Sequence, residues 1–189
     1  MQPYELKVRI EHEIEITPTS VILDGQAIAV TERGDKMLVE LYRRYAGDYP
    51  KFFKMDTLCR LGFMAAEILL KHSALSCQPS AVILANRSAS IKNDTDYLAT
   101  ISEGNYYPSP ALFVYTLPNI VTGEIAIRHH IQGETSFYIL DTPEDLEPVI
   151  RSSLHSFTHA PILAGWCECS KQNDFYAKMQ IIWNNSLNN

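Results

Sequence analysis

A catalytic nucleophile in a layered α/β protein is expected where a buried strand ends in an abrupt turn into a helix. Residues 135–140 of this chain read as such a strand. The turn that follows carries Leu140, Asp141, Thr142 and Pro143, without a cysteine or a serine nucleophile. Asp141 would need a partner to act as a general base, and the sequence identifies none. The two acidic residues after the proline would repel a thiolate, so we interpret this turn as a structural helix start.

The spacing of the cysteines and histidines is poor for a metal site. Cys167 and Cys169 fall on one face of a predicted strand, but two thiols are only half of a structural zinc ligand set. His129 and His130 are adjacent on a predicted helix and therefore point in different directions. His12 falls on the apolar face of a strand with no second ligand near it in sequence, which favours a structural histidine. We expect neither a metal nor a cofactor.

Composition excludes several classes of function. The chain has 189 residues, 46% of them hydrophobic and 20% charged, as expected for one globular domain with a substantial core. Its net charge of −6 argues against nucleic acid, and it has no glycine-rich nucleotide-binding motif. No apolar run is long enough to span a bilayer, and the charged residues over 5–16 argue against a signal peptide. With four cysteines and no secretory signal, we expect reduced thiols and a cytoplasmic location.

The first third of the chain predicts a hairpin and two helices. Apolar and charged residues alternate over 6–16, which is typical of a half-exposed strand, and Asp24-Gly25 marks a hairpin turn. The apolar spacing over 37–45 predicts a helix. Residues 55–71 are the clearest helix, because almost every position is apolar or small. We expect it to be buried on most sides, with one narrow polar arc in water: Asp56, Arg60, Glu67 and Lys71.

Strands and helices alternate in the rest of the chain. The apolar run over 81–85 predicts an interior parallel strand. A helix is expected from Asn119 to His130, with Gly133 as its stop. The remaining predicted elements are a strand over 135–140, a helix capped by Thr142, and strands over 162–166 and 179–183.

We interpret this order as a single α/β domain over residues 1–184, with buried helices packed on a mixed five-stranded sheet. An N-terminal hairpin is expected at about residues 5–30. The polar residues 185–189 are expected to be a disordered tail.

Scattered residues in four of these segments form a pattern. They are Met55, Asp56, Arg60, Leu61, Ala65, Ala66 and Glu67; the run over 80–86; Ser109, Pro110, Phe113, Leu117, Pro118, Asn119 and the run over 123–127; and the run over 162–166. Together they resemble the β-ketoacyl synthase family, the condensing enzymes with a thiolase fold. The resemblance covers about residues 52 to 169. It is closest to the synthase-like proteins of aryl polyene and flexirubin-type pigment pathways.

The resemblance implies a family member without catalytic residues. The family fold has two similar halves, and this chain corresponds in length to the first. Family members carry a cysteine at the turn before the helix that begins here near residue 143, and no residue from 135 to 145 is a cysteine. Their other catalytic residues, two histidines or His and Asn, come from the second half. The histidines of this chain that do not match those positions are His129, His130, His155 and His159.

The family dimerises edge to edge through the strand that corresponds to 135–140, and through the preceding helix. The resemblance therefore predicts a partner interface that includes Asn119, Ile120, Ile127, Thr135, Phe137 and Ile139. Half of a two-half fold should also expose apolar surface that needs cover.

Three functions remain open. The first is a non-catalytic subunit in fatty-acid or polyene-type biosynthesis, which pairs with a full condensing enzyme as chain-length-factor-like proteins do and helps to shape the acyl tunnel. The second is a homodimer that binds acyl chains or an acidic acyl carrier protein. A docking patch would then come from Arg43, Arg44, Lys51 and Lys54, which otherwise read as a solvated helix end. The third is a divergent acyltransferase or hydrolase that uses Cys167 or another thiol. We favour the first.

Overall fold

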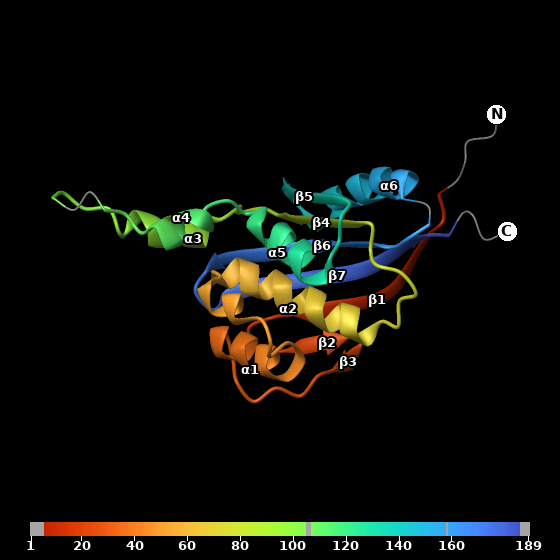
Figure 1. The fold of residues 1–189 in the computed structure, drawn as a ribbon, viewed down its shortest axis with the longest axis horizontal. Coiled ribbons are helices and arrows are strands. Elements are labelled where there is room, and N and C mark those ends of the chain that lie inside the picture. Colours follow the sequence, from red (N-terminus) through yellow and green to blue (C-terminus); the bar gives the residue numbers. More distant parts are fainter. Residues whose placement is uncertain (1–5, 105–106, 158, 186–189) are drawn as a thin grey trace.

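A computed structural model describes residues 6–104, 107–157 and 159–185. It shows an α/β fold on one seven-stranded mixed sheet, in the order β3-β2-β1-β7-β6-β4-β5 (Figure 1). The strands are β1 Val8–Ile16, β2 Val21–Leu23, β3 Gln26–Ala27, β4 Ala81–Asn86, β5 Glu134–Ile139, β6 Ile162–Lys171 and β7 Asp174–Asn184. The α-helices are α1 Asp35–Tyr45, α2 Thr57–His72, α3 Ile91–Leu98, α4 Pro110–Val114, α5 Ile120–His129 and α6 Leu146–Ser156. Two 3-10 helices are η1 Pro50–Lys54 and η2 Pro143–Asp145.

The α/β fold class is confirmed, but the predicted count of five strands is wrong. The two strands of the Asp24-Gly25 hairpin, β2 and β3, are three and two residues long. Strands this short cannot show the alternation of apolar and polar residues by which a strand is counted from sequence. Of the predicted tail at 185–189, residues 186–189 lie outside the described residues, as do residues 1–5 at the start of the predicted hairpin region.

The sheet has a parallel half and an antiparallel half. β4 lies between β5 and β6 and is parallel to both, as its continuous apolar sequence predicted. β6 pairs antiparallel with its other neighbour, β7, and β7, β1, β2 and β3 continue the sheet in antiparallel pairs. β5 is the last strand of the parallel half, so within the described part of the chain no strand pairs with its outer edge, which we call the open edge.

Helices cover the two faces of the sheet unequally (Figure 1). One face packs against α1, α2 and α5 and forms the larger core, which includes Phe63, Leu69 and Ile125. The other face packs against α6 and forms a smaller core around Ile83 and Leu154. Among the described residues, no helix is both long and apolar enough to cross a membrane.

Helix α2 is buried more completely than its sequence predicted. Asp56 caps it by accepting the Cys59 N–H at 2.9 Å. The polar arc was expected to lie in water, but Glu67 has no exposed surface at all. The reason is that α5 packs along this side of α2 and brings cationic side chains to the carboxylate.

Helix α5 ends within one residue of its predicted end, but Gly133 is not the residue that stops it. Its C-cap is His130, which adopts the left-handed conformation with φ 55°. The expected stop, Gly133, lies beyond the helix and serves a different purpose. A Cβ atom there would lie 1.8 Å from the carbonyl oxygen of Ser80, so only glycine allows the two backbones to approach this closely.

Helices α3 and α4 form an arm that extends from one end of the molecule (Figure 1). Hydrogen bonds join the two helices: Asn93 Nδ2 donates to the Leu112 carbonyl at 2.8 Å, and Ser90 Oγ donates to the Thr116 carbonyl at 2.7 Å. Ser109 caps α4 by accepting the Leu112 N–H. We refer to residues 91–104 and 107–117 as the arm.

Candidate functional site

The turn at which a nucleophile was considered is a closed helix cap. Thr142 donates from both its backbone N–H and its hydroxyl to the Asp145 carboxylate, at 3.0 and 2.9 Å. The Asp145 side chain therefore occupies the helix start where an anionic group would otherwise be stabilised. Leu140 is half-buried and donates its N–H to the Asn86 carbonyl, while Asp141 is exposed. This arrangement agrees with the structural helix start that the sequence predicted.

The thiols of the core are poorly suited to nucleophilic chemistry. Cys59, Cys167 and Cys169 are all buried, and Cys167 and Cys169 lie on the same face of β6, in the larger core. Burial raises the pKa of Cys59 and Cys167 well above the usual 9, and that of Cys169 to about 12. A buried thiol that stays protonated is a weak nucleophile. Cys77 alone among the four is partly exposed.

Strand β5 presents an unpaired backbone edge. Leu140, which follows it, donates its N–H toward β4, and N–H groups alternate in direction along a strand. The N–H groups of Thr135, Phe137 and Ile139 therefore point away from β4, toward the open edge. An open edge of this kind is a template for pairing with another strand.

Apolar side chains flank this edge on the α5 face of the sheet. Ile127 of α5 is 61% exposed and Ile139 of β5 is 52% exposed. Phe137 is half-buried and packs against the larger core, which places the alternate residues Thr135 and Ile139 on the same face. Asn119 is exposed and Ile120 is half-buried at the start of α5.

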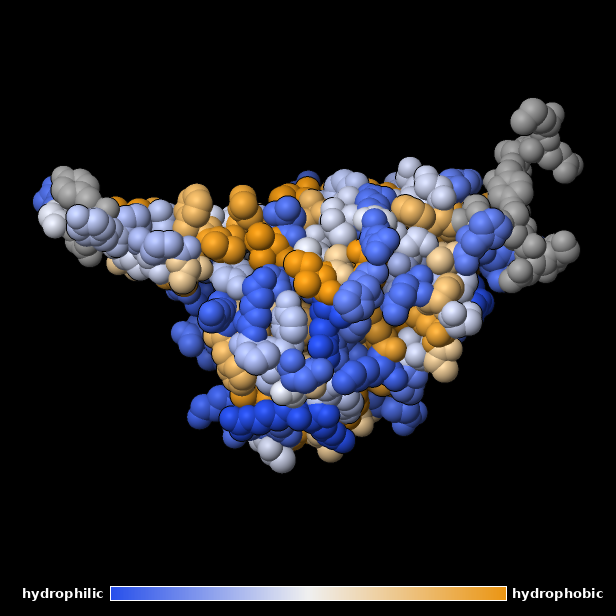
Figure 2. Space-filling view, viewed as in Figure 1, coloured by the Kyte–Doolittle hydropathy of each residue, from blue (hydrophilic) through white to orange (hydrophobic). Residues whose placement is uncertain are grey.

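The arm continues this apolar surface. Phe113, Val114 and Leu117 are 57%, 47% and 55% exposed. Figure 2 shows apolar side chains gathered where the arm meets the body and over α5. We call these three residues together with Ile127 and Ile139 the edge surface. A contiguous apolar patch on a folded protein marks an interaction site more often than chance exposure does.

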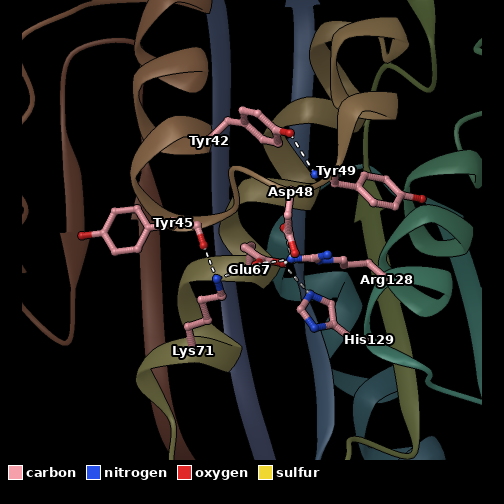
Figure 3. Close-up of polar contacts among 8 residues, drawn as sticks. All are labelled: Tyr42, Tyr45, Asp48, Tyr49, Glu67, Lys71, Arg128 and His129. Carbon is pink, nitrogen blue, oxygen red and sulfur yellow. Dashed lines mark hydrogen bonds and ion pairs between the residues drawn. The ribbon is translucent and has the colours of Figure 1, made fainter.

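Buried charges hold α5 in the position that exposes Ile127. The guanidinium of Arg128 donates to both oxygens of Glu67, at 3.2 Å each, and to Asp48 at 2.7 Å (Figure 3). His129 Nε2 lies 3.2 Å from Glu67, and Lys71 Nζ lies 3.2 Å from the same carboxylate. Burial alone would raise the pKa of Glu67, but His129 and Arg128 hold it at about 2, below the usual 4.5. The carboxylate therefore stays ionised and links α5 to α2.

A second inward charge strengthens this attachment. Glu124 is buried one helical turn before Arg128 and accepts a hydrogen bond from the Tyr49 hydroxyl at 3.0 Å. It also forms an ion pair with Lys51. Helix α5 thus points its charged residues inward and Ile127 outward, the reverse of an ordinary surface helix.

The predicted carrier-protein patch is exposed, but two of its cations have partners within the chain. Lys51 pairs with Glu124, and Arg44 donates to the Ala29 carbonyl at 2.9 Å while it stacks over Tyr45. The remaining two, Arg43 and Lys54, are exposed at the ends of α1 and η1. A docking role for this patch remains a prediction.

Sequence reasoning missed two features of this site. It placed Glu67 in water and assigned no partner to Arg128 or His129, because contacts between distant segments leave no local signal. It also did not identify the exposed arm residues. The high apolar content of 111–117 was visible in the sequence, yet exposure cannot be read from five helical residues.

No protein-family model matches the chain, and no curated protein matches it. Solved structures do match. A chain of the complex between the ketosynthase ApeO and its chain length factor ApeC, from Xenorhabdus doucetiae, superposes with a TM-score of 0.65 at 12% sequence identity. The match covers 96% of this chain and 80% of that chain, so the two are similar in length. This likeness confirms the thiolase-like fold that the resemblance predicted.

Proposed function

We propose that this protein is a non-catalytic β-ketoacyl-synthase-like subunit, similar to a chain length factor, that assembles with a full condensing enzyme. The observation that carries the proposal is the open β5 edge bordered by the edge surface. Such an edge offers backbone hydrogen bonds, and the apolar side chains beside it offer area to bury. A partner strand that pairs with β5 would take up the backbone hydrogen bonds, and a partner surface that covers Ile127 would bury the apolar area.

The absence of a nucleophile at the β5–α6 turn supports a role in assembly over a role in chemistry. The Thr142–Asp145 cap fills the helix start, and burial keeps the Cys167 thiol protonated. The matched chain comes from an assembly of a ketosynthase with its chain length factor and is about as long as this one. We therefore infer that the partner is a complete condensing enzyme of a fatty-acid or polyene-type pathway, and that this chain helps to shape the space for the growing acyl chain.

Co-expression with a tagged condensing enzyme from the same genome, followed by size-exclusion chromatography, tests the proposal. We expect a heterodimer with the unaltered chain and a loss of at least about fivefold in affinity for Ile127→Ser, since a central apolar contact typically contributes more than about 1 kcal/mol to binding. Ile10→Ser is the matched control. Ile10 is 51% exposed, like the residues of the edge surface, but it lies on β1, which β7, β6 and β4 separate from β5.

Three outcomes would contradict the proposal. A stable monomer that binds no such enzyme would remove the partner altogether. A homodimer that persists in the presence of the condensing enzyme would favour the self-associating protein instead. Equal loss of binding from Ile127→Ser and Ile10→Ser would show that the edge surface is not where the partner binds.

A further inference from the structure

Three side chains that are far apart in the sequence converge at the hairpin end of the sheet. They are His12 of β1, Asp24 in the β2–β3 turn and His72 at the C-terminus of α2. His12 Nδ1 lies 2.7 Å from Asp24 Oδ2, and His72 Nε2 lies 3.2 Å from the same oxygen. The three ligand atoms all lie within 4.8 Å of one another. His12 was interpreted from the sequence as structural because no second ligand lay near it, but folding supplies two.

The backbone holds the Asp24 carboxylate in place. Its other oxygen, Oδ1, accepts the Glu13 N–H at 2.8 Å, and the Asp24 N–H donates to the Glu13 carbonyl at 2.9 Å. Asp24 itself has φ 48°, in the left-handed region that the tight turn requires. One carboxylate oxygen is thus occupied by the backbone, and the other is directed at both imidazoles.

We propose that His12 Nδ1, Asp24 Oδ2 and His72 Nε2 bind a divalent transition-metal ion with the ligand preference of Zn²⁺. Two imidazole nitrogens and one carboxylate oxygen are a ligand set that suits such ions. Ligand atoms at about 2.0 to 2.2 Å from tetrahedral zinc lie about 3.3 Å from one another. The two contacts to Asp24 Oδ2, at 2.7 and 3.2 Å, and the 4.8 Å limit on the three ligand atoms lie within reach of that geometry by side-chain rotation.

The surroundings agree with an accessible site that has a free coordination position. The side chain of His72 is 47% exposed and that of Asp24 is 34% exposed, so an ion and a water molecule can enter from solvent. Three protein ligands leave the fourth tetrahedral position to water or to an external group. The two imidazole rings are also in contact, edge to face with centroids 4.9 Å apart.

Occupancy would join the hairpin to the end of α2. The ligands come from three elements, and a metal bound only by the folded chain stabilises the fold by mass action. β5 lies at the opposite end of the sheet order from the hairpin, so this site is separate from the edge surface and does not depend on the proposed partner.

Isothermal titration of the metal-free full chain with ZnCl₂ tests the proposal. All proteins should carry Cys77→Ser, because Cys77 is a partly exposed thiol that could bind zinc by itself. We expect one saturable site and a higher melting temperature in zinc. His12→Gln, His72→Gln and Asp24→Asn should each weaken binding at least tenfold, while His155→Gln, at an exposed histidine of α6, should leave it unchanged. Asp24→Asn keeps an oxygen for the Glu13 N–H and tolerates the turn conformation, so it separates metal binding from folding.

The ligand variants could fail to fold, so a second measurement uses the protein in which all histidines are retained. Zinc should shift the imidazole NMR signals of His12 and His72 at substoichiometric amounts and leave that of His155 unchanged. The proposal is overturned if those signals do not move, or if the three ligand variants bind zinc as tightly as the parent. In that case the cluster is a pair of histidine–carboxylate contacts without an ion.

Discussion

The α2–α5 interface and the edge surface use charged and apolar residues in opposite ways. At the interface, Glu67 and Glu124 are buried and neutralised by cations, and few of their polar atoms face water. At the edge surface, the apolar side chains of Phe113 and Ile139 are more than half exposed. Charges that are costly to bury are retained inside, and apolar groups that could be buried are left outside. The interior contacts position α5, and the surface that α5 carries is available to a partner.

This difference predicts that substitutions in the two regions will act on different properties. Changes at the interior charges should lower the free energy of unfolding. Changes at the edge surface should leave that free energy unaltered and weaken the complex.

The largest expected effect is on stability, from Glu67→Gln. The substitution leaves Arg128 and Lys71 beside a neutral, buried amide, and removing one partner of a buried ion pair typically costs about 3–5 kcal/mol. Urea denaturation followed by circular dichroism measures it. Glu147→Gln, which breaks the exposed Glu147–Arg151 pair of α6, is the control and should change stability by less than about 0.5 kcal/mol. Similar losses from the two variants would contradict the distinction between interior and surface charges.

The next effect is on assembly, from Ile139→Pro. Proline removes an N–H that points to the open edge, so the pairing with β4 is kept while pairing with an added strand is blocked. We expect at least a tenfold loss of affinity for the condensing enzyme, measured by titration, with the melting temperature close to that of the parent. Undiminished binding would show that the partner does not pair with β5.

A smaller effect is a pH dependence with opposite signs at two carboxylates of α2. Burial raises the pKa of Asp56 to about 6, above its usual 3.8, so its contribution to stability falls as the pH rises from about 4 to 6. The pKa of Glu67 is held at about 2, below 4.5, so its contribution is present above pH 4.5 and is lost as the pH falls toward 2. Unfolding measured from pH 2 to 7 should show the first slope vanish in Asp56→Asn and the second in Glu67→Gln. Unchanged profiles in both variants would contradict these assignments.

The smallest expected difference is in how fast the four thiols react with an alkylating reagent. Iodoacetamide at pH 8 should modify Cys77 first, because the other three thiols are buried and remain protonated. Peptide mass spectrometry of the native protein gives the order. Rapid modification of Cys167 would favour the third function considered from the sequence, a divergent acyltransferase that uses this thiol.

The sequence predicted the features that local periodicity and cap chemistry determine. The interior strand at 81–85, the Thr142 cap and the buried helix at 55–71 all have strong short-range signals. It could not predict the Glu67–Arg128 ion pair or the His12–Asp24–His72 cluster, because each joins elements separated by many residues. The proposal that β5 is a partner-binding edge came from the resemblance, since the sequence of a strand does not show which of its two edges is unpaired.

The central claim is that a condensing enzyme pairs with β5, and backbone hydrogen exchange of this chain tests it most directly. The amides of Thr135, Phe137 and Ile139 point to the open edge and should exchange rapidly in the isolated chain. In the complex we predict strong protection of these three amides, while those of β4, already paired on both sides, change little. A complex that forms without added protection at β5 would contradict the account.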